Sequence, residues 1–215
     1  MRIAILGGTG NEGAGLALRW ALAGHEVVIG SRNAERARAK AEEFARQIQS
    51  GSIHGLSNLD AARAGELVVL ALPYAGLATI LSEVKEVCRG KVVASTVVPL
   101  SFGAGRLFTP PAIGSAAEEA QALLGPDARV VAAFHHIAAH ALASVDHPIE
   151  CDLLLCGNDA GAKQQVAELA TSLGLRPVDA GPLTNAGPLE GITAVLATIN
   201  RRYKLKASGI KITGL

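Results

Sequence analysis

The opening of the chain constrains its fold more than any other segment. A short apolar run, residues 3–6 (IAIL), is followed at once by the glycine-rich stretch GGTGNEG at residues 7–13. The pattern G-x-G-x-x-G is weak by itself, because the chain has 24 glycines. Here it lies between a buried strand and the start of a helix, which is the setting that a phosphate-binding turn requires. The segment therefore predicts a dinucleotide-binding turn.

The three glycines of the pattern have separate roles. Gly8 allows the tight turn, Gly10 lets the backbone approach a pyrophosphate, and Gly13 lets the helix pack closely on the strand. Free backbone N–H groups and the positive end of the helix then favour phosphate. Glu12 argues against a phosphate site here, because a carboxylate repels phosphate. The backbone would hold the anion, however, so the Glu12 side chain can point sideways.

The rest of the chain alternates between strands and helices, which predicts an α/β fold: a Rossmann-type, doubly wound, mostly parallel sheet with right-handed crossovers. We expect residues 1–145 to form the nucleotide-binding domain and residues 146–215 a smaller C-terminal α/β lobe that closes the cofactor cleft. Residues 96–114 carry several Pro and Gly residues without a periodic pattern and are expected to be a long, functional loop. The expected strands are 3–6, 26–29, 52–56, 67–71, 91–94, 129–134, 152–156 and 176–179, and the expected helices are 11–23, 33–49, 76–87, 116–124, 160–173 and 189–203, with a helical turn near residue 60.

The end of the second strand distinguishes NADP from NAD. NAD-binding sites place an Asp or Glu there to hold the ribose 2′-hydroxyl, whereas this chain has Ser31 and Arg32. A guanidinium and a hydroxyl are donors for a 2′-phosphate, and Arg36, one helical turn further, can reach the same group. Charge-assisted hydrogen bonds contribute roughly 1.5–3 kcal/mol each, so two of them would favour NADP by about two to four powers of ten. The alternative is that both arginines are solvated surface charges.

Composition excludes several classes of partner. The chain has 215 residues, 20 basic and 19 acidic, and a formal net charge of +1, so nothing indicates nucleic acid or an anionic membrane. The longest apolar stretch, residues 67–81, contains a proline and a glycine and is too short for a membrane span. Cys88, Cys151 and Cys156 form no CxxC pair and are expected to be small buried hydrophobic residues in a reducing cytoplasm.

Four stretches resemble the NADP oxidoreductases that depend on coenzyme F-420, a deazaflavin. They are MRIAILGGTGNEGAGLALRWALAGHEVVIGSR at the start, ALP at residues 71–73 within LALP, TVVPLS at 96–101, and DAGPLTN at 179–185 followed by the terminal GIK. The resemblance covers residues 1 to about 110 and 129 to the end. Glu12 departs from the apolar residue associated with that position in the family.

The resemblance implies reversible hydride transfer between NADP(H) and F-420, with no catalytic acid or base and no metal. It implies a cytoplasmic protein with small-molecule partners, and a homodimer. The implied NADP contacts, together with Gly8 of the motif, are Thr9, Gly10, Asn11, Glu12, Ser31, Arg32 and Arg36, with Leu72 and Pro73 beside the nicotinamide. The implied deazaflavin contacts are Val98, Pro99 and the segment from His135 through Ile137 to Ala139, together with the C-terminal lobe.

Three histidines and a basic tail leave alternatives open. One hypothesis is that His135 donates a hydrogen bond to a ring carbonyl of the deazaflavin; the other is that His135, His136 and His140 are all structural. His136 and His140 have the i, i+4 spacing that could place both on a metal ion, but no acid or cysteine lies nearby in the sequence to complete such a site. The basic tail consists of Arg201, Arg202, Lys204, Lys206 and Lys211. Its charges could attract the acidic tail of F-420, or they form an ordinary solvent-exposed face.

Other functions also fit the nucleotide turn. One alternative is an NADP-dependent imine reductase of the pyrroline carboxylate type, although those enzymes usually have a longer helical C-terminal domain. A second alternative is a relative of the cytosolic domain of membrane ferric reductases. A third is a non-enzymatic NADP redox sensor, which binds nucleotide without turnover.

Overall fold

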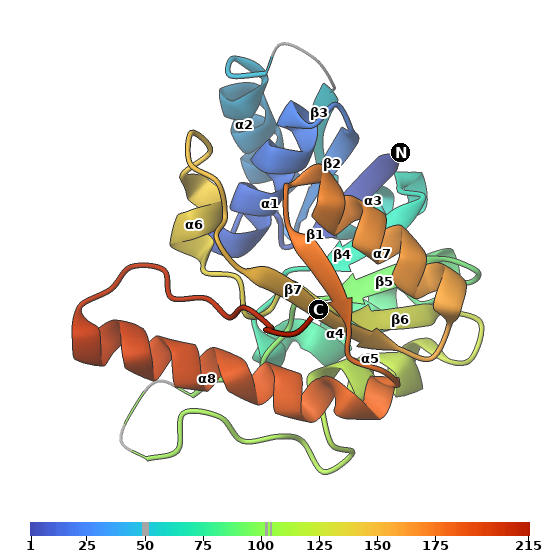
Figure 1. Cartoon of the computed structure of the whole chain (residues 1–215). Helices are drawn as coiled ribbons and strands as arrows, with labels where there is room; N and C mark the ends of the chain where they lie inside the picture. The colour runs from blue at the N-terminus through green and yellow to red at the C-terminus, as the bar shows by residue number, and fades with distance from the viewer. Residues whose placement is uncertain (49–51, 102, 104) are drawn as a thin grey trace.

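The structure, a computed structural model, describes residues 1–48, 52–101, 103 and 105–215. Its centre is one eight-stranded sheet of order β3-β2-β1-β4-β5-β6-β7-β8 (Figure 1). All neighbouring strands are parallel except β6 and β7, which are antiparallel. The strands are β1 (Arg2–Leu6), β2 (Glu26–Ser31), β3 (Ser52–Ser57), β4 (Leu67–Leu70), β5 (Val92–Ser95), β6 (Arg129–Ala132), β7 (Asp152–Gly157) and β8 (Arg176–Asp179). The predicted mostly parallel Rossmann-type sheet is confirmed.

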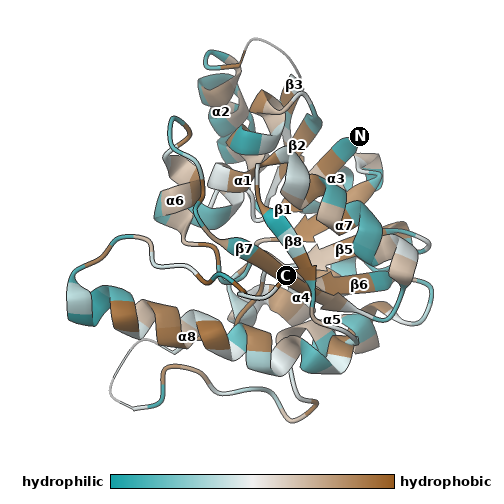
Figure 2. Ribbon diagram, in the orientation of Figure 1, coloured by the Kyte–Doolittle hydropathy of each residue, from teal (hydrophilic) through white to brown (hydrophobic). Residues whose placement is uncertain are grey.

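Helices cover both faces of this sheet. Successive side chains of a strand point to opposite faces, so Ile3 and Ile5 of β1 join one apolar core while Ala4 and Leu6 join the other. This burial on both faces explains why the central strands are continuously apolar, as Figure 2 shows by their colour. The first core is closed by α1 (Asn11–Leu22), α2 (Ala34–Ala45), α6 (Ala139–Ala143) and α7 (Ala160–Ser172), and the second by α3 (Asn58–Ala64), α4 (Leu77–Val84), α5 (Ala116–Leu124) and α8 (Ala186–Tyr203).

Several predicted boundaries were wrong. The helix expected at 76–87 is α4 flanked by two 3-10 turns, Tyr74–Gly76 and Glu86–Cys88. The strand expected to reach residue 134 ends at Ala132, because Phe134 has a φ of 64° that no strand residue adopts. The last helix begins at Ala186, three residues earlier than expected, with a proline in its first turn, where the missing N–H costs nothing. The predicted end of the second helix at Gln49 lies outside the described residues, and α2 itself ends at Ala45.

The strands of the C-terminal part of the chain extend the central sheet. Strand β7 pairs antiparallel with β6, and β8 continues the same sheet at its edge. The last helix, α8, packs on α5, and the tail that follows it returns across the sheet toward β7 (Figure 1). The division at residue 145 and the closing of the cleft by residues 146–215 stay predictions.

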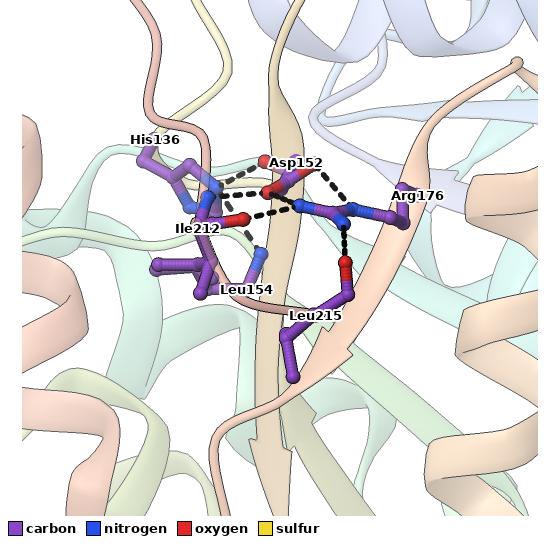
Figure 3. A network of polar contacts seen from close by, with 6 residues as sticks. All are labelled: His136, Asp152, Leu154, Arg176, Ile212 and Leu215. Carbon is purple, nitrogen blue, oxygen red and sulfur yellow. Dashed lines mark hydrogen bonds and ion pairs between the residues drawn. The ribbon is translucent and has the colours of Figure 1, made fainter.

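An ion pair between the buried Asp152 and the exposed Arg176 holds this tail in place (Figure 3). The Asp152 carboxylate accepts hydrogen bonds from Nε (2.9 Å) and Nη2 (2.6 Å) of Arg176 and from the backbone N–H of Ile212 (2.6 Å). Arg176 also donates to the carbonyl oxygens of Ile212 and Leu215. These bonds, led by those from Arg176, lower the pKa of Asp152 to about 2. The last residues are therefore fastened to β7 and β8.

The three cysteines are free and buried, as predicted. Burial raises the pKa of Cys88 and of Cys151 to about 11, which leaves both as unreactive thiols at neutral pH. Among the helices of the described residues, none is long and apolar enough to cross a membrane.

Candidate functional site

A cleft of about 560 Å³ opens at the carboxyl edge of the sheet. The chain runs from β1 outward to β2 and β3 and then returns to the other side of β1 to form β4, so the strand order reverses there. Ligands of doubly wound sheets bind at such a reversal, beyond the carboxyl ends of the strands. Seven of the predicted site residues line this cleft together: Thr9, Gly10, Ser31, Arg32, Arg36, Leu72 and Pro73.

The glycine turn forms the floor of the cleft. Gly7 has a φ of 75° and a side chain there would collide with the Ala71 carbonyl, while a Cβ on Gly13 would lie 2.8 Å from the Gly8 Cα. Gly8 is buried, and its N–H is shared by the Ile5 (3.1 Å) and Gly30 (3.0 Å) carbonyls. No side chain caps α1, which begins directly after Gly10, so its first N–H groups stay free for an anion. The backbone of this turn fits a pyrophosphate.

The other end of the cleft fits a 2′-phosphate. Ser31 is the last residue of β2, and its hydroxyl accepts from the Asn33 N–H (3.2 Å), which leaves its own proton to donate. Asn33 caps α2 by accepting from the Arg36 N–H (3.0 Å), and this places Arg36 in the first turn of that helix. Both Arg32 and Arg36 are exposed, and neither belongs to an ion pair of the described residues. The described lining of the cleft includes no Asp or Glu, so nothing in it repels a phosphate.

Asn58 was missed by the sequence reasoning. It lies directly after β3, is only 4% exposed, and its Oδ1 accepts from the Gly7 N–H (3.2 Å). The side chain thus links the ends of β3 and β1 and holds the glycine turn in position beside Ser31. Its signal in the sequence was a polar pair, Ser57-Asn58, immediately after a predicted strand, at the edge where ligands bind. Thr79 and Ile80 of α4 also line the cleft without having been predicted.

Glu12 does not line the cleft described above, and its Oε1 is buried without a hydrogen-bond partner. Burial raises the pKa of Glu12 to about 8, and the nearby Thr96 hydroxyl opposes this only in part. Thr96 follows β5, so the Glu12 side chain points away from Ser31 and toward the β4 and β5 side. The carboxyl group is therefore neutral at pH 7, which removes the predicted repulsion of the pyrophosphate.

The remaining predicted residues lie outside this cleft. Asn11 and Ala139 line a second groove between α1 and α6. Val98 is half-buried and Pro99 is buried in the loop after β5, while His135 and Ile137 are buried at 3% and 4% exposure. The structure thus brings Ala139 into one groove with Asn11, whereas Val98, Pro99, His135 and Ile137 share none of the described cavities with the predicted NADP residues. The contacts of all five with F-420 stay predictions.

Arg19 fixes the position of the segment that contains Ala139. Its guanidinium donates to the carbonyl oxygens of Leu142 (2.8 Å), Ala141 (2.8 Å), Ser144 (2.7 Å) and His147 (3.0 Å). These four bonds satisfy carbonyls in the last turn of the short helix α6 and in the residues that follow it, and they hold this segment against α1. The groove beside the glycine turn therefore has a rigid wall.

The three histidines lie in different surroundings. His136 is buried, and its Nε2 lies 3.1 Å from the Asp152 carbonyl oxygen and 3.3 Å from the Leu154 N–H (Figure 3). His140 lies exposed on α6, so the two do not share a helix face. His135 has neither ring nitrogen paired, and burial lowers its pKa to about 3, so it stays neutral. Across the described residues, no group of three His, Cys, Asp or Glu side chains is placed to hold a metal ion.

The fold and the cleft define a Rossmann-type dinucleotide-binding protein. A family model described as "NADP oxidoreductase coenzyme F-420-dependent" matches residues 2–99. The F-420-dependent NADP reductase of Methanocaldococcus jannaschii is 43% identical over 224 residues, covering 100% of this chain and 99% of its own length. The chain belongs to the family of F-420-dependent NADP reductases.

Solved structures agree with this placement. A protein of Arthrobacter sp. FB24, provisionally described as an F-420-dependent NADP reductase, superposes with a TM-score of 0.83 at 30% identity and covers 98% of both chains. An imine reductase of Bacillus cereus has a TM-score of 0.66 at 18% identity, and this chain covers 63% of it. The second likeness shows the fold alone.

Proposed function

We propose that this protein catalyses reversible hydride transfer between NADP(H) and the deazaflavin coenzyme F-420. One observation carries the proposal: a cleft that joins a pyrophosphate-binding turn to Ser31, Arg32 and Arg36 belongs to a chain that matches an F-420-dependent NADP reductase over its full length. The hydride passes between C4 of the nicotinamide and C5 of the deazaflavin, and the two rings supply the electronic chemistry. The protein then has to bind, orient and desolvate them.

The residues of the cleft divide this work along its length. The turn at residues 7–13 would hold the pyrophosphate through backbone N–H groups, while Arg32 and Arg36 would hold the 2′-phosphate. Leu72 and Pro73 follow β4 on the opposite side of β1 and would contact the nicotinamide side of the cofactor. Val98, Pro99, His135, Ile137 and Ala139 remain the proposed deazaflavin side.

Mixing the protein with NADPH and F-420 tests the activity. We expect loss of the visible absorbance of the oxidised deazaflavin at a rate proportional to enzyme concentration, with NADH far less effective than NADPH. Tight NADP binding without this loss would refute the proposal and favour an imine reductase or a redox sensor. Neither alternative is favoured by the full-length similarity.

We also propose that the protein is cytoplasmic and forms a homodimer. The dimer is supported by large apolar side chains that are exposed on α8 and just after it. Their exposed fractions are 58% for Val195, 66% for Tyr203 and 51% for Leu205. In Figure 2, α8 has hydrophobic bands along its exposed length. Light scattering would give twice the chain mass for the wild type and the single mass for Val195→Asp if α8 forms the contact; a monomeric wild type would refute the dimer.

A further inference from the structure

The side chain of Asn58 crosses the end of β2 and lies between the glycine turn and the 2′-phosphate end of the cleft. The register pairs Ser31 of β2 with Ser57 of β3, so Asn58 follows directly after the row that contains Ser31. Its Oδ1 nevertheless reaches the Gly7 N–H (3.2 Å) at the end of β1. A Cβ on Gly30 of β2 would come within 2.9 Å of this oxygen, so the glycine leaves the room that the amide occupies. The amide is thus fixed between the glycine turn and Ser31.

The hydrogen bond to Gly7 determines which end of the Asn58 amide is free. A backbone N–H is a donor, so the atom that accepts from it must be the amide oxygen and not the NH2 group. The side chain is 4% exposed, yet its Nδ2 is neither bonded to another described residue nor closed off from solvent. Asn58 lines the cleft together with Ser31 and Arg32. Two N–H donors therefore face the space that a nucleotide would fill.

The adenosine ribose of NADP has one hydroxyl that the proposed contacts leave without a partner. Its 2′ carbon carries the phosphate assigned to Ser31, Arg32 and Arg36, and its 5′ carbon carries the pyrophosphate assigned to the glycine turn. C3′ is bonded to C2′ and to C4′, which carries C5′, so the 3′-hydroxyl lies on the edge of the ribose between these two anchored positions. Asn58 lies between the same two groups of protein atoms. A ligand hydroxyl that enters the cleft loses hydrogen bonds to water, and the Asn58 donor supplies a replacement.

We propose that Asn58 binds the 3′-hydroxyl of the adenosine ribose, with its Nδ2 donating to the hydroxyl oxygen. The inference rests on the proposed function, because that function places NADP in the cleft. It adds a specificity-determining residue, since the cleft would then recognise the intact ribose as well as its 2′-phosphate. The same side chain holds the glycine turn through Oδ1, so one amide would serve the ribose and the pyrophosphate together.

A purely structural role of Asn58 predicts a different result from a direct contact. If the side chain only holds Gly7, its loss disturbs the turn and weakens every ligand that has a pyrophosphate by the same factor. If Nδ2 also contacts the ribose, the loss is larger for a ligand that has the 3′-hydroxyl than for one that lacks it. The ratio of two affinities measured on one protein separates these cases, because a change in the turn affects both ligands alike and cancels.

Calorimetric titrations measure this ratio without turnover and without F-420. The two ligands are 2′-phospho-ADP-ribose and its analogue that lacks the 3′-hydroxyl of the adenosine ribose. We expect the wild type to bind the first roughly fivefold more tightly, as for one hydrogen bond, and Asn58→Ala to bind both equally. Gln164→Ala, which removes an amide from an exposed site on α7, should keep the ratio of the wild type. In NMR spectra of the wild type, the side-chain amide signals of Asn58 should shift more with 2′-phospho-ADP-ribose than with the analogue, a measurement that needs no variant.

The outcomes for Asn58 and for the proposed function are distinguishable. A wild type that binds both ligands equally tightly, or an Asn58→Ala variant that keeps the wild-type preference, overturns the contact with the 3′-hydroxyl. If Asn58→Ala does not fold, equal shifts of the Asn58 amide signals with the two ligands overturn the contact instead. A wild type that binds neither ligand overturns the placement of NADP in the cleft. Normal binding of both ligands without reduction of F-420 by NADPH overturns the proposed activity alone.

Discussion

Glu190 makes the stability of this protein depend on pH in a direction opposite to that of most carboxylates. The side chain lies on α8, is 1% exposed, and accepts hydrogen bonds from the Ala116 and Ala117 N–H groups (3.0 Å each) at the start of α5. Burial raises its pKa to about 7 from an ordinary value of 4.5; the two N–H bonds oppose the shift, and the nearby carboxylates of α5 add to it.

The sign and size of the effect follow from linkage. Between pH 4.5 and 7 the folded protein keeps the Glu190 proton while the unfolded chain has lost it, so the free energy of unfolding falls as the pH rises. A difference of about 2.5 pKa units at 1.36 kcal/mol each gives about 3 kcal/mol. Glu190→Gln has no proton to lose, and its amide satisfies only one of the two N–H groups, at a cost of about 1–3 kcal/mol at low pH.

Urea unfolding of both proteins at several pH values measures this difference. We expect Glu190→Gln to be less stable than the wild type at pH 4.5 and to recover that deficit by pH 7.5, so that the two curves of free energy against pH converge or cross. Glu83→Gln, exposed on α4, should follow the wild type throughout. Parallel curves for the wild type and Glu190→Gln would refute the assignment of a raised pKa to Glu190.

Three further changes test other parts of the structure. Arg32→Ala should raise the KM for NADPH by roughly 10- to 100-fold, the loss of one charge-assisted bond, with little change for NADH in steady-state assays; equal losses for both nucleotides would contradict a 2′-phosphate contact. Charge reversal at Arg201 and Arg202 should raise the KM for F-420 and not that for NADPH, and an unchanged KM for F-420 removes the basic tail from recognition. Arg176→Ala should speed hydrogen exchange of the tail at residues 210–215, because Asp152 loses its main partner. In the wild type, the lowered pKa of Asp152 contributes stability that is present above the ordinary pKa and is lost as the pH falls toward 2; this contribution should be smaller in the variant. Unchanged exchange at Ile212 would show that the tail is held by other contacts.

The course of the main chain could be predicted because its signals are local. The glycine turn, the apolar runs of β1 and β4, and the cap Asn33 each specify an element within a few residues. Boundaries were less predictable, since they depend on packing. Phe134 has a positive φ, and its ring packs edge-on against Trp20 (5.3 Å between centroids), a contact between positions more than 100 residues apart.

In the candidate site, too, residues specified by local sequence could be predicted, and residues placed by packing could not. Ser31 and Arg32 were found because a motif places them at a set distance after the glycines. Asn58 was missed because its role depends on β3 lying beside β2, which sequence spacing does not state. The buried position of His135 and Ile137 follows from α8 and the tail, which cover a segment that the sequence leaves open.

The sequence by itself determined the nucleotide turn, the preference for a 2′-phosphate and the order of strands and helices, because each depends on residue type at short spacing. Only the tertiary structure decided that β7 and β8 extend one sheet and that the tail is fastened by Asp152 and Arg176. It also decided that Glu12, an apparent obstacle to phosphate in the sequence, is buried and neutral. A carboxyl group takes its charge from its surroundings: burial raises the pKa of Glu12, and the one side chain that opposes the shift, Thr96, is more than 80 residues away in the chain.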